Sequence, residues 1–221
     1  MYVSVDCVLF GYKSELSIFL IRRTNPYFKN KWSLPGSIIF EDESLESAAK
    51  RTVFELLGLK DVKLIQVQAF GDPERTSGKP RILTVAYLCL LNRNHYNLEL
   101  KVKNRTFISQ TNEEEIILEG KWFLAEELKD LPQDHLQIAQ YSLNHLKEIF
   151  KNSSLGLSLL PEKFTMKELQ HLYECIFGMN YDPSNFRKKM IKNHQLKEWI
   201  QWDGNGSKKK TKLYSLPKSK N

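Results

Sequence analysis

The chain has 221 residues and a formal net charge of +7. That length suits one large domain or two smaller ones, well above the size at which a hydrophobic core becomes hard to build. No apolar run is long enough to suggest a membrane span, and residues 1–10 lack the basic start of a signal peptide. We therefore expect a cytoplasmic protein without a membrane partner.

Charge divides the chain into two parts. Residues 1–154 contain 20 basic and 20 acidic side chains, which cancel, whereas residues 155–221 contain 13 basic and 6 acidic ones. The whole positive excess therefore lies in the last third. Such asymmetry favours an anionic partner for that part, most often nucleic acid, although a solvated basic tail is the plainer alternative.

Hydrophobic patterns in the first 150 residues predict a mixture of strands and helices. Runs rich in Val, Ile and Leu predict strands at 3–10, 16–21, 62–70, 82–91 and 120–124. Helical patterns predict helices at 43–57, 125–131 and 134–150, the first of them closed by Gly58. Between these elements we expect a turn-rich loop at 71–80, a polar insertion without assigned structure at 92–119 and a linker at 151–154.

In and just after the first predicted helix, Glu43, Arg51, Glu55 and Gly58 have the spacing of a Nudix box, and this resemblance implies a metal site with carboxylates at positions 52, 55 and 56. Positions 52, 55 and 56 lie three and four residues apart, so they share a helix face on which carboxylates could converge on Mg²⁺. Only Glu55 is acidic there, because Thr52 and Leu56 occupy the other two positions. One carboxylate is a poor Mg²⁺ site, so we expect no metal, no cofactor and hydrolytic activity that is weak or absent.

The segment around this helix resembles a Nudix box that has lost most of its chemistry. The motif reads Gly-x5-Glu-x7-Arg-Glu-U-x-Glu-Glu-x-Gly-U, where U is apolar. Here Ser37 stands in place of the first glycine, while Glu43, Arg51, Glu55 and Gly58 remain. The resemblance implies that Glu43 pairs with Arg51 and holds the preceding loop against the helix.

The last third predicts two helices followed by a β-hairpin. A capping box, Thr165 to Glu168, precedes an apolar run that ends at Gly178, and Asp182-Pro183 opens a second helix over 184–193. Two strands, at 196–202 and 212–216, then flank a glycine-containing turn. This order is typical of a winged helix-turn-helix, whose second helix enters the major groove of DNA.

Polar and basic side chains on the second helix and at the hairpin tip are the candidates for DNA contact. On the helix, Phe186 and Met190 share the inward face and the polar positions lie opposite. Lysines at the tip can reach a backbone phosphate or the minor groove. The alternative is an ordinary solvated helix face. The candidates are Ser184, Asn185, Arg187, Lys188, Lys189, Lys192, Lys208, Lys209 and Lys210.

The whole chain resembles the Nudix-related transcriptional regulators, in which a degenerate Nudix domain is joined to a winged helix. Besides the box, the resemblance rests on residues 70–75, 85–87, 159–161, 164–165, 168–170, 172–174 and 185–189. It implies an α+β fold, with a Nudix α/β/α sandwich over 1–151 and a winged helix-turn-helix over 155–221. It also implies a homodimer on double-stranded operator DNA and a small effector, either ADP-ribose or a sugar such as arabinose.

Arginines are the best candidates for contacts to a diphosphate or sugar effector, because a guanidinium group binds phosphate oxygens in pairs. Each arginine taken alone could equally form a surface salt bridge. Two acidic side chains complete the candidate set. The effector candidates are Arg22, Arg23, Arg75, Arg81, Asp72 and Glu43.

Two other functions remain open at this point. A working Nudix hydrolase that cleaves a nucleoside diphosphate-linked substrate with Mg²⁺ could draw carboxylates from Glu113, Glu114 and Glu115. A nucleic-acid-binding or scaffold protein without a ligand is the other alternative. The residues identify neither the effector nor the operator, and they do not distinguish a repressor from an activator.

Overall fold

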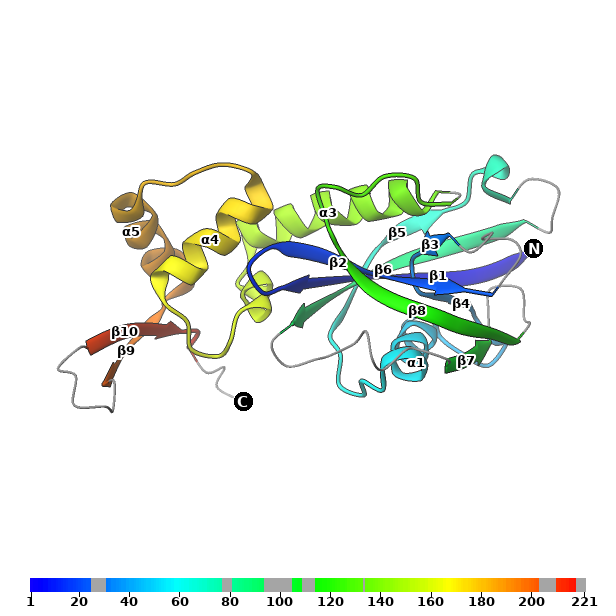
Figure 1. Ribbon diagram of the computed structural model, residues 1–221, viewed down its shortest axis with the longest axis horizontal. Coiled ribbons are helices and arrows are strands. Elements are labelled where there is room, and N and C mark those ends of the chain that lie inside the picture. Colours follow the sequence, from blue (N-terminus) through cyan, green and yellow to red (C-terminus); the bar gives the residue numbers. More distant parts are fainter. Residues whose placement is uncertain are drawn as a thin grey trace.

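The computed structural model of the protein describes residues 1–24, 31–76, 81–93, 105–108, 114–132, 134–202 and 210–217. Two units follow one another along the long axis: a sheet covered by helices, and a smaller helical unit with a hairpin (Figure 1). In these residues, no helix combines the length and the apolar character that a bilayer crossing requires.

The described part of the first unit contains a mixed sheet of eight strands. The order is β5-β6-β1-β2-β8-β7, with β3 paired to β2 and β4 paired to β1. Because β1 is parallel to β6 and antiparallel to β2, β2 ends at the side of the sheet where β1 and β6 begin. The strands are β1 (Tyr2–Tyr12), β2 (Leu16–Arg23), β3 (Trp32–Ser33), β4 (Gly36–Ile38), β5 (Leu64–Phe70), β6 (Ile82–Asn92), β7 (Arg105–Ile108) and β8 (Glu114–Leu124).

Two helices cover the two faces of this sheet. Successive side chains of β1 alternate between the faces: Val8 and Phe10 pack with α3 (His135–Asn152), whereas Leu9 packs with α1 (Leu45–Leu57). Figure 1 shows α3 and α1 on opposite sides of the sheet. The expected α/β/α sandwich is therefore confirmed.

Some elements of the structure differ from those that the hydrophobic pattern predicted. The strand predicted at 120–124 begins earlier, at Glu114, because its backbone pairs with β7 on one side and β2 on the other. Part of the segment left without assigned structure is thus an antiparallel strand pair. The short helix predicted at 125–131 is wrong: Asp130 has a φ of 52°, a backbone conformation that a right-handed helix cannot contain.

The junction between the units is shorter than the predicted linker. Helix α3 continues through Asn152, and the 3₁₀ helix η3 (Leu155–Leu159) packs against β6 and α3. One hydrophobic core runs from the α3 face of the sheet into the second unit. The domain limits at 151 and 155 stay a prediction.

The second unit contains α4 (Met166–Phe177), α5 (Pro183–His194) and the antiparallel strands β9 (Lys197–Trp202) and β10 (Lys210–Ser215). The predicted capping box of α4 is confirmed: Thr165 Oγ1 accepts from Glu168 N at 3.1 Å, and Glu168 Oε2 accepts from Thr165 N at 2.7 Å. Two helices followed by this strand pair confirm the expected winged helix-turn-helix.

Candidate DNA-binding surface and effector site

Helix α5 is fixed in place by its first turn and by one apolar face. Asp182 is the N-cap, and its Oδ1 accepts a hydrogen bond from Asn185 N at 2.8 Å, while Pro183 occupies the first turn. Three residues spaced one turn apart anchor the helix in the core; the sequence predicted the first two of them. They are Phe186, Met190 and His194.

Most of the remaining positions of α5 form a polar, exposed surface, whereas Ile191 packs against the core. Arg187 Nη2 lies 3.4 Å from Glu198 Oε1 of β9, whereas the lysines of α5 form no ion pair with other residues in the described ranges. Exposed cations in a row can replace the counterions of a phosphate backbone. The exposed candidates on this helix are Ser184, Asn185, Arg187, Lys188, Lys189 and Lys192.

The wing beside α5 carries further cations. Lys210 is exposed at the start of β10, and Lys212 Nζ pairs with Glu198. Lys212, followed by Arg187, lowers the pKa of the Glu198 carboxyl. In the described residues, Glu198 thus forms ion pairs with these two cations and with none of the lysines of α5. Lys208 and Lys209 lie outside the described residues, so their contact with DNA stays a prediction.

The box helix α1 uses two of its altered positions for packing. Ser37 and Thr52, which replace a glycine and a glutamate of the motif, hydrogen-bond through their hydroxyl groups, and Thr52 also donates to the Ala48 carbonyl at 2.8 Å. Leu56, which replaces a second glutamate, is completely buried in the core between α1 and the sheet. This face of α1 therefore points into the protein.

The preserved charges of the box form a structural clamp. Arg51 Nε and Nη2 each lie 2.8 Å from a carboxylate oxygen of Glu43, and Nη2 also donates to the Ile38 carbonyl at 2.8 Å. The hydrogen bond from Arg51 keeps the pKa of the Glu43 carboxyl below its usual value. Arg51 also lies 3.5 Å from Glu55. The expected pairing of Glu43 with Arg51 is confirmed.

Two acidic side chains of the remnant box, Glu43 and Glu55, share Arg51 in the part of the chain that the structure describes. There, no three His, Cys, Asp or Glu side chains are grouped so that they could hold a metal ion. Glu113 and the side chains of Glu114 and Glu115 lie outside that part. A contribution of these three acids to a metal site stays a hypothesis.

The arginine candidates for the effector lie at separate places in the sheet unit. Arg22 and Arg23 end β2, Arg75 belongs to the segment before β6, and Arg81 directly precedes β6. Strand β2 ends, and β6 begins, on the side of the sheet remote from the winged helix (Figure 1). Arg22, half-exposed at the end of β2, lies 2.8 Å from Glu119 Oε2. Arg81, exposed just before β6, donates to the Gly71 carbonyl at 2.8 Å. Asp72 is exposed at the start of the neighbouring 3₁₀ helix η2 (Pro73–Thr76). These three side chains are within reach of a ligand in solvent.

Arg23 and Arg75 are buried and already contact groups of the protein. Arg23 Nη2 donates to the Leu34 carbonyl at 2.7 Å. Arg75 Nη2 lies 2.9 Å from Asp6 Oδ2, and its Nε lies 2.6 Å from Asp134 Oδ2. An arginine held between two carboxylates inside a protein joins the elements that carry them, here β1 and the start of α3. A direct effector contact by either arginine stays a prediction.

A buried imidazole beside Arg75 was missed by the sequence reasoning. His135 Nδ1 accepts a hydrogen bond from Leu34 N at 3.0 Å, and its Nε2 lies 3.9 Å from Asp6 Oδ1. Burial lowers the pKa of His135 to about 4, so the ring is neutral near pH 7. The signal for this cluster was Asp6, an acid within an apolar strand, because a buried charge requires partners.

Two family models match the chain, one for each unit. The NUDIX domain matches residues 2–143. The NrtR DNA-binding winged helix domain matches residues 156–216. The two matches follow one another in the order of the two units of the structure.

Among the proteins that resemble the chain are a curated repressor and two solved structures. The ADPR responsive transcriptional repressor NtrR of Acinetobacter baylyi is 31% identical over 206 residues, which are 90% of this chain and 76% of that protein. The crystal structure of Shewanella oneidensis NrtR complexed with a 27mer DNA is 26% identical, with a TM-score of 0.76 over 97% of this chain and 93% of that one. The NUDIX domain of the same Shewanella protein, complexed with ADP ribose, is 26% identical, with a TM-score of 0.51 over 66% of this chain and 88% of that one.

Proposed function

The chain belongs to the Nudix-related transcriptional regulators, and from that premise we propose that it is an ADP-ribose-responsive repressor that binds operator DNA. The observation that carries the proposal is the joint match of a NUDIX domain and an NrtR winged helix within one chain. The similarity to a repressor over 90% of this chain supports both halves of the function together.

The proposed DNA interface is the exposed face of α5 with the adjacent wing. Asn185 near the start of the helix is suited to a base edge, whereas Lys188 and Lys192 are suited to phosphates. The likeness of the whole chain to a protein crystallised on a 27mer DNA supports this assignment. The burial of Phe186 and Met190 supports it as well, since the polar face must then point outward.

The proposed effector is ADP-ribose, bound at the sheet end where β2 finishes and β6 begins. The relative from Acinetobacter is named for its response to ADPR, and the similar NUDIX domain was crystallised with ADP ribose. Arg22 and Arg81 are the two candidate arginines that solvent reaches, and because they lie at the ends of separate strands we propose that only one of them contacts the diphosphate. A sugar such as arabinose has no comparable support.

We further propose that the Nudix domain reads its ligand without cleaving it. Two of the three motif glutamates are replaced, by Thr52 and Leu56, and both side chains are buried. The third, Glu55, lies beside Arg51. A metal-assisted hydrolysis needs carboxylates that converge on Mg²⁺ from one open face, and α1 offers no such group of acids among the residues described.

A homodimer completes the proposal. One recognition helix reads a short half-site, and a two-fold pair reads a palindromic operator with half-sites about one helical turn apart. An effector shifts the operator affinity only through its different affinities for the DNA-binding and the non-binding arrangement of the dimer.

The test is a binding titration with a fluorescent promoter fragment and a random duplex of equal length. We expect tight, salt-dependent binding to the promoter fragment, and release of it on addition of ADP-ribose but not of arabinose. If ADP-ribose leaves the operator affinity unchanged, the proposal that the protein senses ADP-ribose is contradicted. If the random duplex binds with equal affinity, the proposal that the protein recognises a specific operator is contradicted.

The hydrolase alternative is separated by a second measurement. The protein is incubated with ADP-ribose and Mg²⁺, and formation of AMP is followed over time. We expect ADP-ribose to stay intact while it binds. Rapid turnover would contradict the proposal of a non-cleaving regulator and favour a working Nudix hydrolase with a basic C-terminal part.

A further inference from the structure

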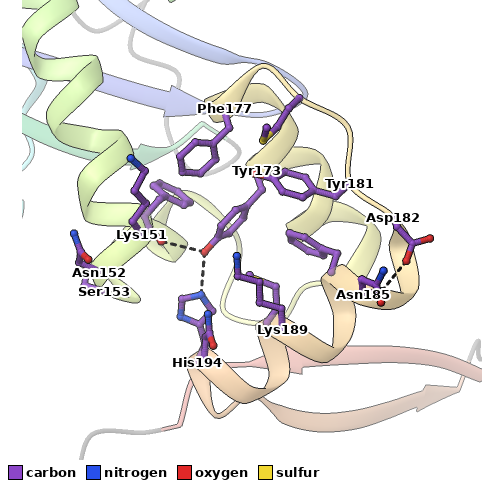
Figure 2. A pocket seen from close by; sticks show the side chains of 15 residues that line it. Lys151, Asn152, Ser153, Tyr173, Phe177, Tyr181, Asp182, Asn185, Lys189 and His194 are labelled. Atoms are coloured by element: carbon purple, nitrogen blue, oxygen red, sulfur yellow. Dashed lines mark hydrogen bonds between the residues drawn. The ribbon is translucent and has the colours of Figure 1, made fainter.

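A chain of hydrogen bonds joins the end of the recognition helix α5 to the end of α3. His194 Nε2 lies 2.9 Å from the hydroxyl of Tyr173 on α4, and that hydroxyl lies 3.3 Å from the Phe150 carbonyl of α3 (Figure 2). On its other side, His194 Nδ1 lies 2.8 Å from Ser154 Oγ, between α3 and η3. We call these four residues the latch.

One arrangement of protons satisfies every polar group of the latch. Ser154 donates to Nδ1 of His194, the Nε2–H donates to the Tyr173 oxygen, and the Tyr173 hydroxyl donates to the Phe150 carbonyl. This arrangement requires a neutral imidazole, and burial lowers the pKa of His194, which favours that form. Buried groups that lose such partners cost free energy, so the latch resists separation of the elements that it joins.

Helix α3 connects the latch to the proposed effector end of the sheet. Its N-cap Asp134 and its first residue His135 contact Arg75 and the Leu34 amide. Its last turn carries the Phe150 carbonyl. The helix has 18 residues, and a straight helix of that size spans about 27 Å at 1.5 Å per residue. A shift of its first turn is therefore carried to the latch as a movement of one rigid element.

The latch lies at a place where the packing leaves room for movement. A cavity of about 670 Å³ opens between the end of α3, α4 and α5. Tyr173 and His194 line it, and Lys189 of α5 lies beside them (Figure 2). A side chain beside an open cavity can shift without displacing a filled core, whereas close-packed interiors resist such shifts.

Other contacts between the units hold α4. Tyr12 at the end of β1 hydrogen-bonds to His171 Nδ1 of α4 at 2.8 Å, and Cys175 of α4 lies 3.8 Å from the Ser14 carbonyl. These contacts fix α4 to the tip of the β1–β2 hairpin. Besides its apolar face, which packs in the common core, α5 is joined to the end of α3 by the latch.

We propose that Tyr173 and His194 are positioning residues, which transmit the effector-dependent position of α3 to the recognition helix α5. This inference rests on the proposed function, since it presumes that ADP-ribose changes the operator affinity. It adds the route by which the change reaches α5. The latch stabilises one arrangement of α5 on α3, and loss of the latch uncouples that arrangement from the effector.

The experiment compares full-length wild type with Tyr173→Phe, Ser154→Ala and Tyr181→Phe. Operator affinity is measured with and without ADP-ribose, and the ratio of the two dissociation constants is the readout. Tyr173→Phe removes one hydroxyl and keeps the ring. Tyr181→Phe is the matched control, because its ring lines the same cavity and its hydroxyl forms no hydrogen bond with the described residues.

We expect Tyr173→Phe and Ser154→Ala each to reduce the ADP-ribose effect on operator affinity by about fivefold or more, because Ser154→Ala removes one hydrogen bond of the latch and Tyr173→Phe removes two. Calorimetry should give an ADP-ribose affinity of the free protein within about twofold of wild type, since the effector site is remote. Tyr181→Phe should behave as wild type. A double variant Tyr173→Phe/His194→Phe should lose little more than Tyr173→Phe alone, because both residues belong to one chain of bonds.

Each failure has its own signature. If wild type does not respond to ADP-ribose, the proposed function fails. If wild type responds and both Tyr173→Phe and Ser154→Ala respond as strongly, the latch proposal is overturned. If circular dichroism shows that Tyr173→Phe does not fold, Ser154→Ala alone decides the outcome, because the Ser154 hydrogen bond is the less buried end of the latch.

Discussion

The two units differ in how they use several of their cationic side chains. In the sheet unit, Arg75 and Arg23 are buried, and Arg51 is clamped by Glu43. In the winged helix, the lysines of α5 are exposed. Helices α1 and α5 are close in size, with 13 and 12 residues, but α1 buries six of them and α5 three. Charge that is paired inside supports the fold and a ligand site, whereas charge left outside is available to a polyanion.

The largest effect should follow from breaking the interior pair. Arg75→Ala leaves Asp6 and Asp134 without their shared cation, so we expect a loss of about 3–5 kcal/mol in the free energy of unfolding. Urea unfolding measures it. Arg81→Ala is the control, because that arginine is exposed and should cost less than about 1 kcal/mol. Equal losses at both positions would remove the distinction between paired interior charge and surface charge.

A glutamate placed at position 56, where the Nudix motif has one, tests whether this face of α1 serves packing. Leu56→Glu should destabilise the protein by about 3–4 kcal/mol, since it exchanges a fully buried apolar side chain for a charge. It should not produce ADP-ribose hydrolysis with Mg²⁺. Phe54→Glu on the same helix is the control, because Phe54 is 43% exposed. A stable, hydrolytic Leu56→Glu protein would contradict the proposal that this face of α1 serves packing.

Acid should weaken the protein through His135. Burial holds the pKa of this imidazole at about 4 in the folded state, against 6.5 for the free side chain. Between these values only the unfolded state takes up the proton, so stability falls as the pH falls from 6.5 to 4, by up to about 3 kcal/mol. His135→Asn can still accept from the Leu34 amide but does not titrate. Unfolding midpoints measured against pH should decline less in that variant; parallel curves would contradict the prediction.

The smallest effects belong to the exposed charges of α5. Lys188→Ala and Lys192→Ala should each weaken operator binding by about 1 kcal/mol and lower the salt dependence by about one ion, because each removes one phosphate contact. Lys167→Ala, an exposed lysine of α4, is the control. Unchanged operator affinity in both α5 variants would contradict the proposal that α5 is the recognition helix. Fluorescence anisotropy at several salt concentrations provides the measurement.

Patterns local in the chain were predicted well. The capping box at Thr165, the N-cap at Asp182 and the inward positions of Phe186 and Met190 depend on residues three or four apart, which the sequence displays directly. The pairing of Glu43 with Arg51 came from motif spacing and is confirmed. The helix predicted at 125–131 failed because one residue with positive φ, Asp130, breaks a favourable composition.

The charge asymmetry, the remnant box and the order of helices and strands were determined by the sequence itself, since each is a property of neighbouring residues. Only the tertiary structure decided which arginines are buried, because Arg75 is joined to Asp6 and Asp134 across 69 and 59 positions. The same holds for the latch, in which Tyr173 meets Phe150 and His194 from separate helices. Contacts between distant segments follow from how the elements pack, and no local pattern encodes them.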